Sequence, residues 1–285
     1  MGKNSDIELF GRKTFFISPD KDSIPDEFLE EFMESGLETY TVSDDASCPM
    51  AAKIEEITKT FPESILIFNI DSKIPGMDWE TFLPTVNKCK GALVGIMHGK
   101  RRSVTDDEKE RSRFERAGKL PAGAIPLGSD RDENKSRIKE TLLKIGARGR
   151  RNLVRATCGK GSTVSFSHGS EEFSARLLDI NVTHFLCDIG ATSSKFDIFE
   201  KIKDADLRFD GFSIKNDAVL IMKRKSSAEN LFIFMFIKPD GSPDLEKEKE
   251  KKLNKKIYKL VMEKNMAALK AAFAAARKLE TKNKK

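Results

Sequence analysis

Short apolar runs and charged, amphipathic stretches alternate from residue 13 to about residue 150, and this alternation constrains the fold more than any other feature. The runs have the length of buried strands, and the stretches between them have a helical period. Strands that take turns with helices form a parallel sheet covered on both faces, so we expect a flavodoxin-like α/β domain. The expected strands are Lys13–Ser18, Glu38–Val42, Ser64–Ile70, Ala92–His98 and Ala122–Leu127, and the expected helices are Pro25–Ser35, Ala51–Thr60, Asp78–Asn87, Asp106–Ala117 and Arg131–Gly146.

The pattern changes at Gly146–Arg151, where two glycines and a cluster of arginines end the fifth helix. Beyond this domain boundary, strand-length segments follow one another without helices, and turn-forming residues such as Lys215–Asp217 lie between them. This pattern predicts a small antiparallel barrel or sandwich, which completes an α/β plus all-β fold class. Its expected strands are Ser162–Ser167, Glu172–Leu178, Thr183–Ile189, Asp206–Phe209, Ser213–Lys223 and Asn230–Phe236.

A helix of about 35 residues is expected after the turn Pro239–Pro243. Its apolar residues recur at steps of three and four, but Lys264 and Asn265 interrupt the stripe. The first half is expected to dock, whereas the alanine-rich second half is left to pair with another chain or to project freely. We therefore divide the chain into residues 1–147, 148–240 and 241–285.

The net charge of +6 is concentrated in this last segment. Residues 244–285 hold 14 Lys/Arg and 6 Asp/Glu, which gives +8, so the remaining chain carries 6 − 8 = −2. Only Tyr258 and Phe273 stand among these lysines, which is too few for a series of base-stacking residues, so the sequence does not favour nucleic acid as a partner.

The sequence lacks the signals that are typical of several functional classes. The chain has no signal peptide and no apolar run of roughly 18 residues, so we expect a cytoplasmic protein with no membrane partner. Its four cysteines stand singly, and His98 and His168 have no partner at metal or triad spacing. We therefore expect no metal, no cofactor and no enzymatic activity.

Residues 71–78 read Asp-Ser-Lys-Ile-Pro-Gly-Met-Asp, which resembles the signature of response-regulator receiver domains. In such domains the first aspartate is phosphorylated, with help from an acidic pair, a Ser/Thr switch and a lysine. This sequence has Ser18-Pro19-Asp20, Met97-His98-Gly99 and Leu127-Gly128 at those places. We therefore expect Asp71 to be a vestigial phospho-acceptor. Asp71 and Asp78 should serve as turn and helix-cap residues, in a domain that binds an unknown protein partner.

The segment from about Arg150 to Lys238 resembles a PilZ domain. Such domains are six-stranded barrels that bind cyclic di-GMP through R-x-x-x-R and, further on, [D/N]-x-S-x-x-G. Arg151 and Arg155 match the first motif, and Asp179 begins the second, in which Asn181 replaces the serine and His184 the glycine. The resemblance implies that cyclic di-GMP is bound by Arg150, Arg151, Arg155, Asp179 and Asn181.

The chemistry of these residues suits that ligand. An arginine fork can hold phosphate oxygens or the O6/N7 edge of guanine, and Asn181 can both donate and accept hydrogen bonds. Glycine at the place of His184 usually supplies a positive φ or room for the ligand. Two alternatives therefore stay open for His184: its ring blocks the pocket, or it stacks on a base.

The sequence thus predicts a cyclic di-GMP-binding regulator that signals by rearranging its domains when the ligand binds. The alternative is an adaptor that binds no nucleotide. In that case both domains would be degenerate and would act through protein contacts, and the C-terminal helix would drive self-association.

Overall fold

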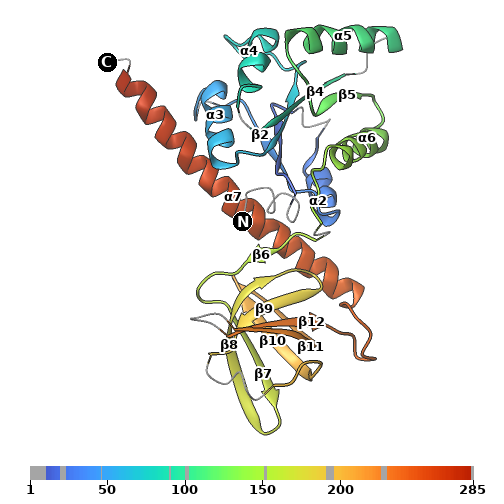
Figure 1. Ribbon diagram of the computed structural model, residues 1–285, viewed down its shortest axis with the longest axis vertical. Coiled ribbons are helices and arrows are strands. Elements are labelled where there is room, and N and C mark those ends of the chain that lie inside the picture. Colours follow the sequence, from blue (N-terminus) through green and yellow to red (C-terminus); the bar gives the residue numbers. More distant parts are fainter. Residues whose placement is uncertain are drawn as a thin grey trace. The chain divides into compact units, whose positions relative to one another are not determined.

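The structure is a computed structural model, and it describes residues 11–19, 24–45, 47–89, 91–99, 103–150, 153–190, 196–225 and 230–283 (Figure 1). The chain divides into two compact units. One comprises Met1–Asn152 together with Lys264–Lys285, and the other comprises Leu153–Glu263. We call them the sheet unit and the barrel unit, and each has its own apolar core.

The sheet unit is built on five parallel strands in the order β2-β1-β3-β4-β5. This is the flavodoxin-like order, so the α/β prediction is confirmed. Apolar side chains fill the strands because helices cover the sheet on both faces. The strands are β1 (Thr14–Ile17), β2 (Thr39–Val42), β3 (Ile65–Asn69), β4 (Leu93–Gly99) and β5 (Gly123–Leu127).

Two groups of helices pack beside the sheet. Lys135 of α6 forms a 2.8 Å ion pair with Glu31 of α2, which fixes these two helices side by side (Figure 1). Arg113 of α5 pairs with Glu80 of α4. Asp78 caps α4 by accepting a hydrogen bond from the Thr81 backbone N–H, as the sequence predicted. The helices are α2 (Asp26–Glu34), α3 (Met50–Thr60), α4 (Trp79–Val86), α5 (Val104–Ala117) and α6 (Arg131–Lys144).

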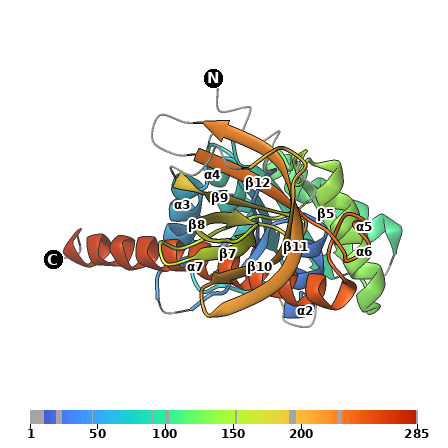
Figure 2. The same cartoon turned by 90° about the horizontal axis from the view of Figure 1, so that it is seen from below.

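The barrel unit is a closed antiparallel barrel of six strands, whose circuit β8-β7-β10-β11-β12-β9 is closed by pairing between β8 and β9 (Figure 2). A short seventh strand, β6, pairs with β8. The strand number and closure confirm the PilZ-like barrel at the level of the fold. The strands are β6 (Ala156–Thr157), β7 (Thr163–His168), β8 (Glu171–Ile180), β9 (His184–Asp188), β10 (Lys201–Phe209), β11 (Phe212–Lys225) and β12 (Asn230–Phe236).

Lys215–Asp217 do not form a turn, so that part of the sequence prediction is wrong. They lie inside β11, where Asn216 is buried. The Asn216 side-chain amide donates to the carbonyl oxygens of Asp217 and Ile237, each at 2.8 Å. These bonds satisfy the buried amide, and they outweigh the turn preference of the three residues.

Helix α7 (Lys247–Asn283) contributes to both units. In the barrel unit Leu253 and Ile257 are buried. In the sheet unit Leu269 and Phe273 are buried, so free projection of the second half is wrong. Asn265 donates a 2.9 Å hydrogen bond to Glu38 within the sheet unit. Across the described ranges, α7 included, no helix combines the length and the apolar character that spanning a membrane requires.

The docking of α7 in the sheet unit yields a stability prediction. Leu269→Ala should lower the free energy of unfolding by about 2–4 kcal/mol, because it leaves a cavity in a packed core. Lys270→Ala, at the exposed neighbouring position, should change it by less than about 0.5 kcal/mol. Trp79 is the single tryptophan and lies in α4, so its fluorescence during urea unfolding follows the sheet unit. Equal midpoints for the two variants would contradict the docking.

Candidate functional site

Arg155 and Asp179 form an ion pair at one edge of the barrel. The Arg155 Nη1 atom lies 2.9 Å from Oδ1 and 3.1 Å from Oδ2 of Asp179. The pairing of β6 with β8 makes this contact, because it sets Ala156 opposite Ile180 and Thr157 opposite Asp179. Both side chains are only partly exposed, at 26% and 20%. The two motifs singled out in the sequence are therefore joined by a direct contact.

A β-bulge lies beside Asp179. The register between β8 and β9 shifts between Leu177 and Asp179, and the Leu178 carbonyl accepts a 2.8 Å hydrogen bond from the Cys158 backbone N–H. A bulge changes the direction in which the following side chain points, and bulges are common beside functional sites. Burial, with a smaller contribution from the Asp179 charge, raises the pKa of the Cys158 thiol to about 12, so this thiol stays protonated.

Asn181 shapes the turn between β8 and β9. Its side-chain oxygen accepts hydrogen bonds from the backbone N–H groups of Thr183 (2.9 Å) and His184 (2.7 Å) and from the Thr183 hydroxyl (3.0 Å). Two backbone donors can only meet an oxygen, so the orientation of the amide is fixed. The side-chain nitrogen donates to no described residue, so it is the part of Asn181 that a ligand can use.

His184 begins β9 with ordinary strand geometry. It pairs with Met235 of β12 and is not among the described residues with positive φ. Its backbone therefore does not need glycine, and the departure from the PilZ motif affects only the space that the ring takes. The Thr183 hydroxyl already donates to Asn181, so the Nδ1 atom 2.6 Å from that hydroxyl must carry the proton. This tautomer leaves Nε2 as an acceptor.

The imidazole of His184 is also held in its neutral form. Burial lowers its pKa, and the positive charge of Arg155 lowers it further, while Asp244 acts in the opposite direction. The site therefore combines one cation, one carboxylate, one amide donor and one neutral ring acceptor, contributed by Arg155, Asp179, Asn181 and His184.

Two further predicted ligand residues are not part of the described barrel unit. Arg150 belongs to the sheet unit, and Arg151 lies outside the described residues. The sequence reasoning missed Thr183, which links Asn181 to His184. Its signal was present, because Asn-x-Thr is a side-chain-to-backbone turn pattern.

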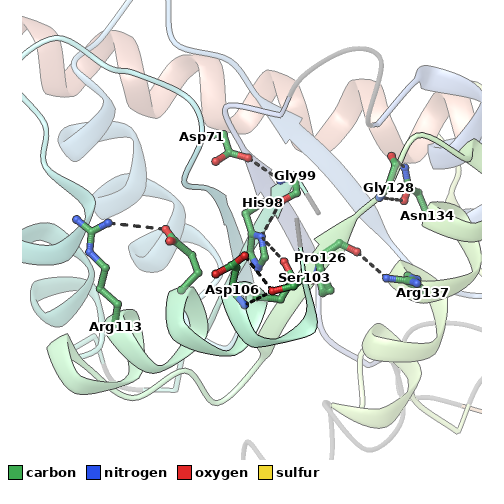
Figure 3. A network of polar contacts seen from close by, with 12 residues as sticks. Asp71, His98, Gly99, Ser103, Asp106, Arg113, Pro126, Gly128, Asn134 and Arg137 are labelled. Carbon is green, nitrogen blue, oxygen red and sulfur yellow. Dashed lines mark hydrogen bonds and ion pairs between the residues drawn. The ribbon is translucent and has the colours of Figure 1, made fainter. Parts of the chain in front are cut away.

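Asp71 lies at the carboxyl edge of the parallel sheet, after β3 (Figure 3). Its carboxylate accepts a hydrogen bond from the backbone N–H of Gly99, at the end of β4. Its own backbone N–H donates to the Asn69 side chain at 3.2 Å. Asp71 thus acts as a turn residue that connects two loops. Asp20, from the expected acidic pair, lies outside the described residues.

Two other positions of that edge have hydrogen-bond partners within the chain. His98 is buried, and its Nδ1 atom lies 2.9 Å from the Gly99 carbonyl oxygen. Where a receiver has its lysine, the Asn134 side chain holds both backbone groups of Gly128, at 2.7 and 2.8 Å (Figure 3). In the part of the chain that the structure describes, no cluster of three or more His, Cys, Asp or Glu could hold a metal ion.

Comparison with known proteins gave matches among solved structures only. No family matches the sequence, and no curated protein does. YcgR from Escherichia coli in complex with c-di-GMP is 15% identical, with a TM-score of 0.38, over 44% of this chain and 52% of that one. The PilZ domain of the same protein, with c-di-GMP, is 16% identical, with a TM-score of 0.36, over 42% of this chain and 97% of that one.

A third similar structure is the complex of K. pneumonia MrkH with c-di-GMP. It is 14% identical, with a TM-score of 0.36, over 42% of this chain and 57% of that one. The matches thus span only about half of the length of full YcgR and MrkH.

The lowered pKa of His184 predicts how the stability of the barrel depends on pH. The native state binds fewer protons than the unfolded state, whose histidine has a pKa of about 6.5. The contribution of the neutral imidazole to the free energy of unfolding is therefore fully present above that pH. The free energy of unfolding should decrease as the pH falls below this value and approaches the lower pKa that His184 has in the folded state. Urea unfolding between pH 8 and pH 5 should show this slope, and His184→Gln should flatten it. The interpretation fails if the variant keeps the full slope.

Proposed function

We propose that this protein is a regulator that binds cyclic di-GMP at the edge of the barrel formed by Arg155, Asp179, Asn181 and His184. The observation that carries the proposal is the ion pair of Arg155 with Asp179, since it joins the two motifs in one partly exposed site. The described residues of this edge offer a guanidinium, a carboxylate, an amide and an imidazole, and these groups suit the binding of a polar anionic ligand.

Arg155 is oriented to receive an anion. Its Nη1 atom donates to Asp179, and Nη2 donates to no residue in the described ranges, so the Nη2 side of the fork can meet phosphate oxygens or the O6/N7 edge of guanine. Its Nε–H is buried without a hydrogen-bond partner among the described residues. Because a buried donor without a partner costs free energy, a ligand acceptor that reached this group would bring an additional gain.

Asp179, Asn181 and His184 offer groups that complement guanine. The Asp179 carboxylate, which Arg155 contacts through both oxygens, is the group that complements the N1–H and N2–H donors of the base, because an ionised carboxylate only accepts hydrogen bonds. The Asn181 nitrogen can donate to O6. The His184 Nε2 atom adds an acceptor, and its ring adds a face on which a base can stack.

The proposed signal is a rearrangement of the two units. Arg150 and Arg151 are among the last residues in the first segment of the sheet unit, and Arg155 belongs to the barrel unit. A dianionic ligand that engages all three arginines favours the arrangement in which they converge. The population therefore shifts by as much as the ligand prefers that arrangement.

One observation favours an adaptor that binds no nucleotide. Arg155 already has a partner in Asp179, and the His184 ring occupies space that glycine would leave open. In this alternative the ion pair is structural, and the protein acts through protein contacts. A solution mass above that of the monomer at all concentrations of cyclic di-GMP, including none, would support it.

Calorimetric titration with cyclic di-GMP tests the proposal. We expect micromolar or tighter binding by the full chain, with cyclic di-AMP as the specificity control. Arg155→Ala and Asp179→Ala should each weaken binding by at least tenfold, because each removes charged hydrogen bonds to the ligand. Arg208→Ala is the matched control, since Arg208 is another barrel arginine paired with a carboxylate, that of Asp206.

Small-angle X-ray scattering of the same samples tests the signal. The radius of gyration should change with cyclic di-GMP in the wild-type protein and in Arg208→Ala, but not in Arg155→Ala. Absence of heat together with absence of thermal stabilisation at saturating ligand would refute binding. Binding without a change in scattering would refute only the rearrangement.

A further inference from the structure

The loop before β10 contains a tight turn with an unexpected residue. The Glu200 backbone N–H donates to the Asp197 carbonyl at 3.1 Å, which closes a four-residue β-turn over residues 197–200. Phe199, the third residue of this turn, has a φ of 72°, whereas Ile198 is not among the residues with positive φ. This combination defines a type II turn, whose third position strongly favours glycine or asparagine.

The same phenylalanine also occupies a bulge position that favours glycine. The Leu220 carbonyl accepts from the Phe199 N–H at 2.7 Å, and the Leu220 N–H donates to the Glu200 carbonyl at 2.9 Å. Two residues thus oppose one, with the first in the left-handed region, as in the bulge type named for its glycine. A bulky side chain with positive φ is a strained outlier.

The strained turn is held firmly by its surroundings. Phe196 is buried against the rings of Phe173 and His168, with centroids 4.9 Å away in each case. His168 lies 3.1 Å from the Glu200 carboxylate, which also accepts from the Asp197 N–H at 2.8 Å. The residues on either side of Ile198 and Phe199 are therefore fixed, which holds the backbone of the turn in place.

Burial does not compensate this strain, because Phe199 is 75% exposed and Ile198 is 49% exposed. Met222, two residues beyond Leu220 on β11, is also 49% exposed. The chain thus keeps a large apolar residue in solvent where glycine would relieve the backbone. A residue that breaks a local rule without a structural gain is expected at a functional position.

Exposed cations occur on the same two strands, β10 and β11, that adjoin these apolar side chains in the sequence. Lys201, Lys203 and Arg224 are exposed, and none has an ion-pair partner in the described ranges. They outnumber the two exposed carboxylates of the same segments, those of Asp197 and Asp204. Lys201 directly follows the turn, and Arg224 lies two residues beyond Met222. An apolar tip bordered by cations complements an apolar phase with an anionic surface.

We propose that the turn Asp197–Glu200 is an anchor for anionic membranes, in which Phe199 and Ile198 enter the bilayer interface and Lys201, Lys203 and Arg224 contact lipid phosphates. The two central residues of a turn form its outer tip, so they project and enclose no pocket for a small ligand. This anchor lies on the membrane rather than across it, so no spanning helix is required. It revises the expectation from the sequence that the protein has no membrane partner.

Sedimentation of the full chain with sucrose-loaded vesicles tests this anchor. We expect binding to phosphatidylcholine vesicles that contain phosphatidylglycerol, and weaker binding without it. Phe199→Asn should lower the partition coefficient roughly tenfold, the lower end of what burying a phenylalanine contributes. Because asparagine tolerates the left-handed region, this variant should keep or raise the thermal midpoint, so lost binding would not reflect unfolding.

Two further variants complete the test. Phe199→Trp should bind as the wild type does, since it keeps an aromatic ring at the tip. Val104→Asn should also bind normally, because Val104 is as exposed as Phe199, at 73%, but lies on α5. Unchanged binding of Phe199→Asn would overturn the proposal, as would absence of binding to both kinds of vesicle. Self-association without lipid that Phe199→Asn abolishes would identify a second copy of the chain as the occupant instead.

Discussion

The burial of apolar side chains of α7 in both compact units is the interaction on which the rest of the structure depends. Leu253 and Ile257 are buried in the barrel unit, and Leu269 and Phe273 are buried in the sheet unit. Each pair is four residues apart and so shares a helix face. The division between the units falls between Glu263 and Lys264, where the polar residues interrupt the apolar stripe. One continuous helix therefore completes two cores, and a change in either core acts on the same element.

Most of the fold could be predicted from the sequence, because hydrophobic periodicity determines which elements form. The parallel strands were located to within one or two residues, and the closed barrel and the long helix were expected. The prediction failed where distant partners override local preference. Asn216 lies in a strand because Ile237, far along the chain, accepts its amide hydrogen. The sequence alone supports two conflicting expectations here, a turn at Lys215–Asp217 and a strand over Ser213–Lys223, and the long-range bond favours the strand.

The candidate site was predictable in its members but not in its connections. Motif matching named Arg155 and Asp179 separately, whereas their contact results from the pairing of β6 with β8, a long-range feature. The question about His184 required a backbone angle, which the sequence does not provide. Phe199 shows the same limit, since its residue type is unremarkable until the turn geometry is known.

In the proposed function, the charges at the ligand site couple the binding of cyclic di-GMP to the rearrangement of the two units. Asp179 neutralises much of the Arg155 charge, so the barrel edge alone offers little net attraction to a ligand with two phosphates. We assign the additional positive charge in this complex to Arg150 and Arg151, which shortly precede Arg155 at the end of the first segment of the sheet unit. In the proposed complex, the arginines that provide affinity are therefore also the ones whose movement changes the arrangement of the units. A variant that gains affinity for cyclic di-GMP from barrel residues alone would bind the ligand tightly but show a smaller rearrangement of the units.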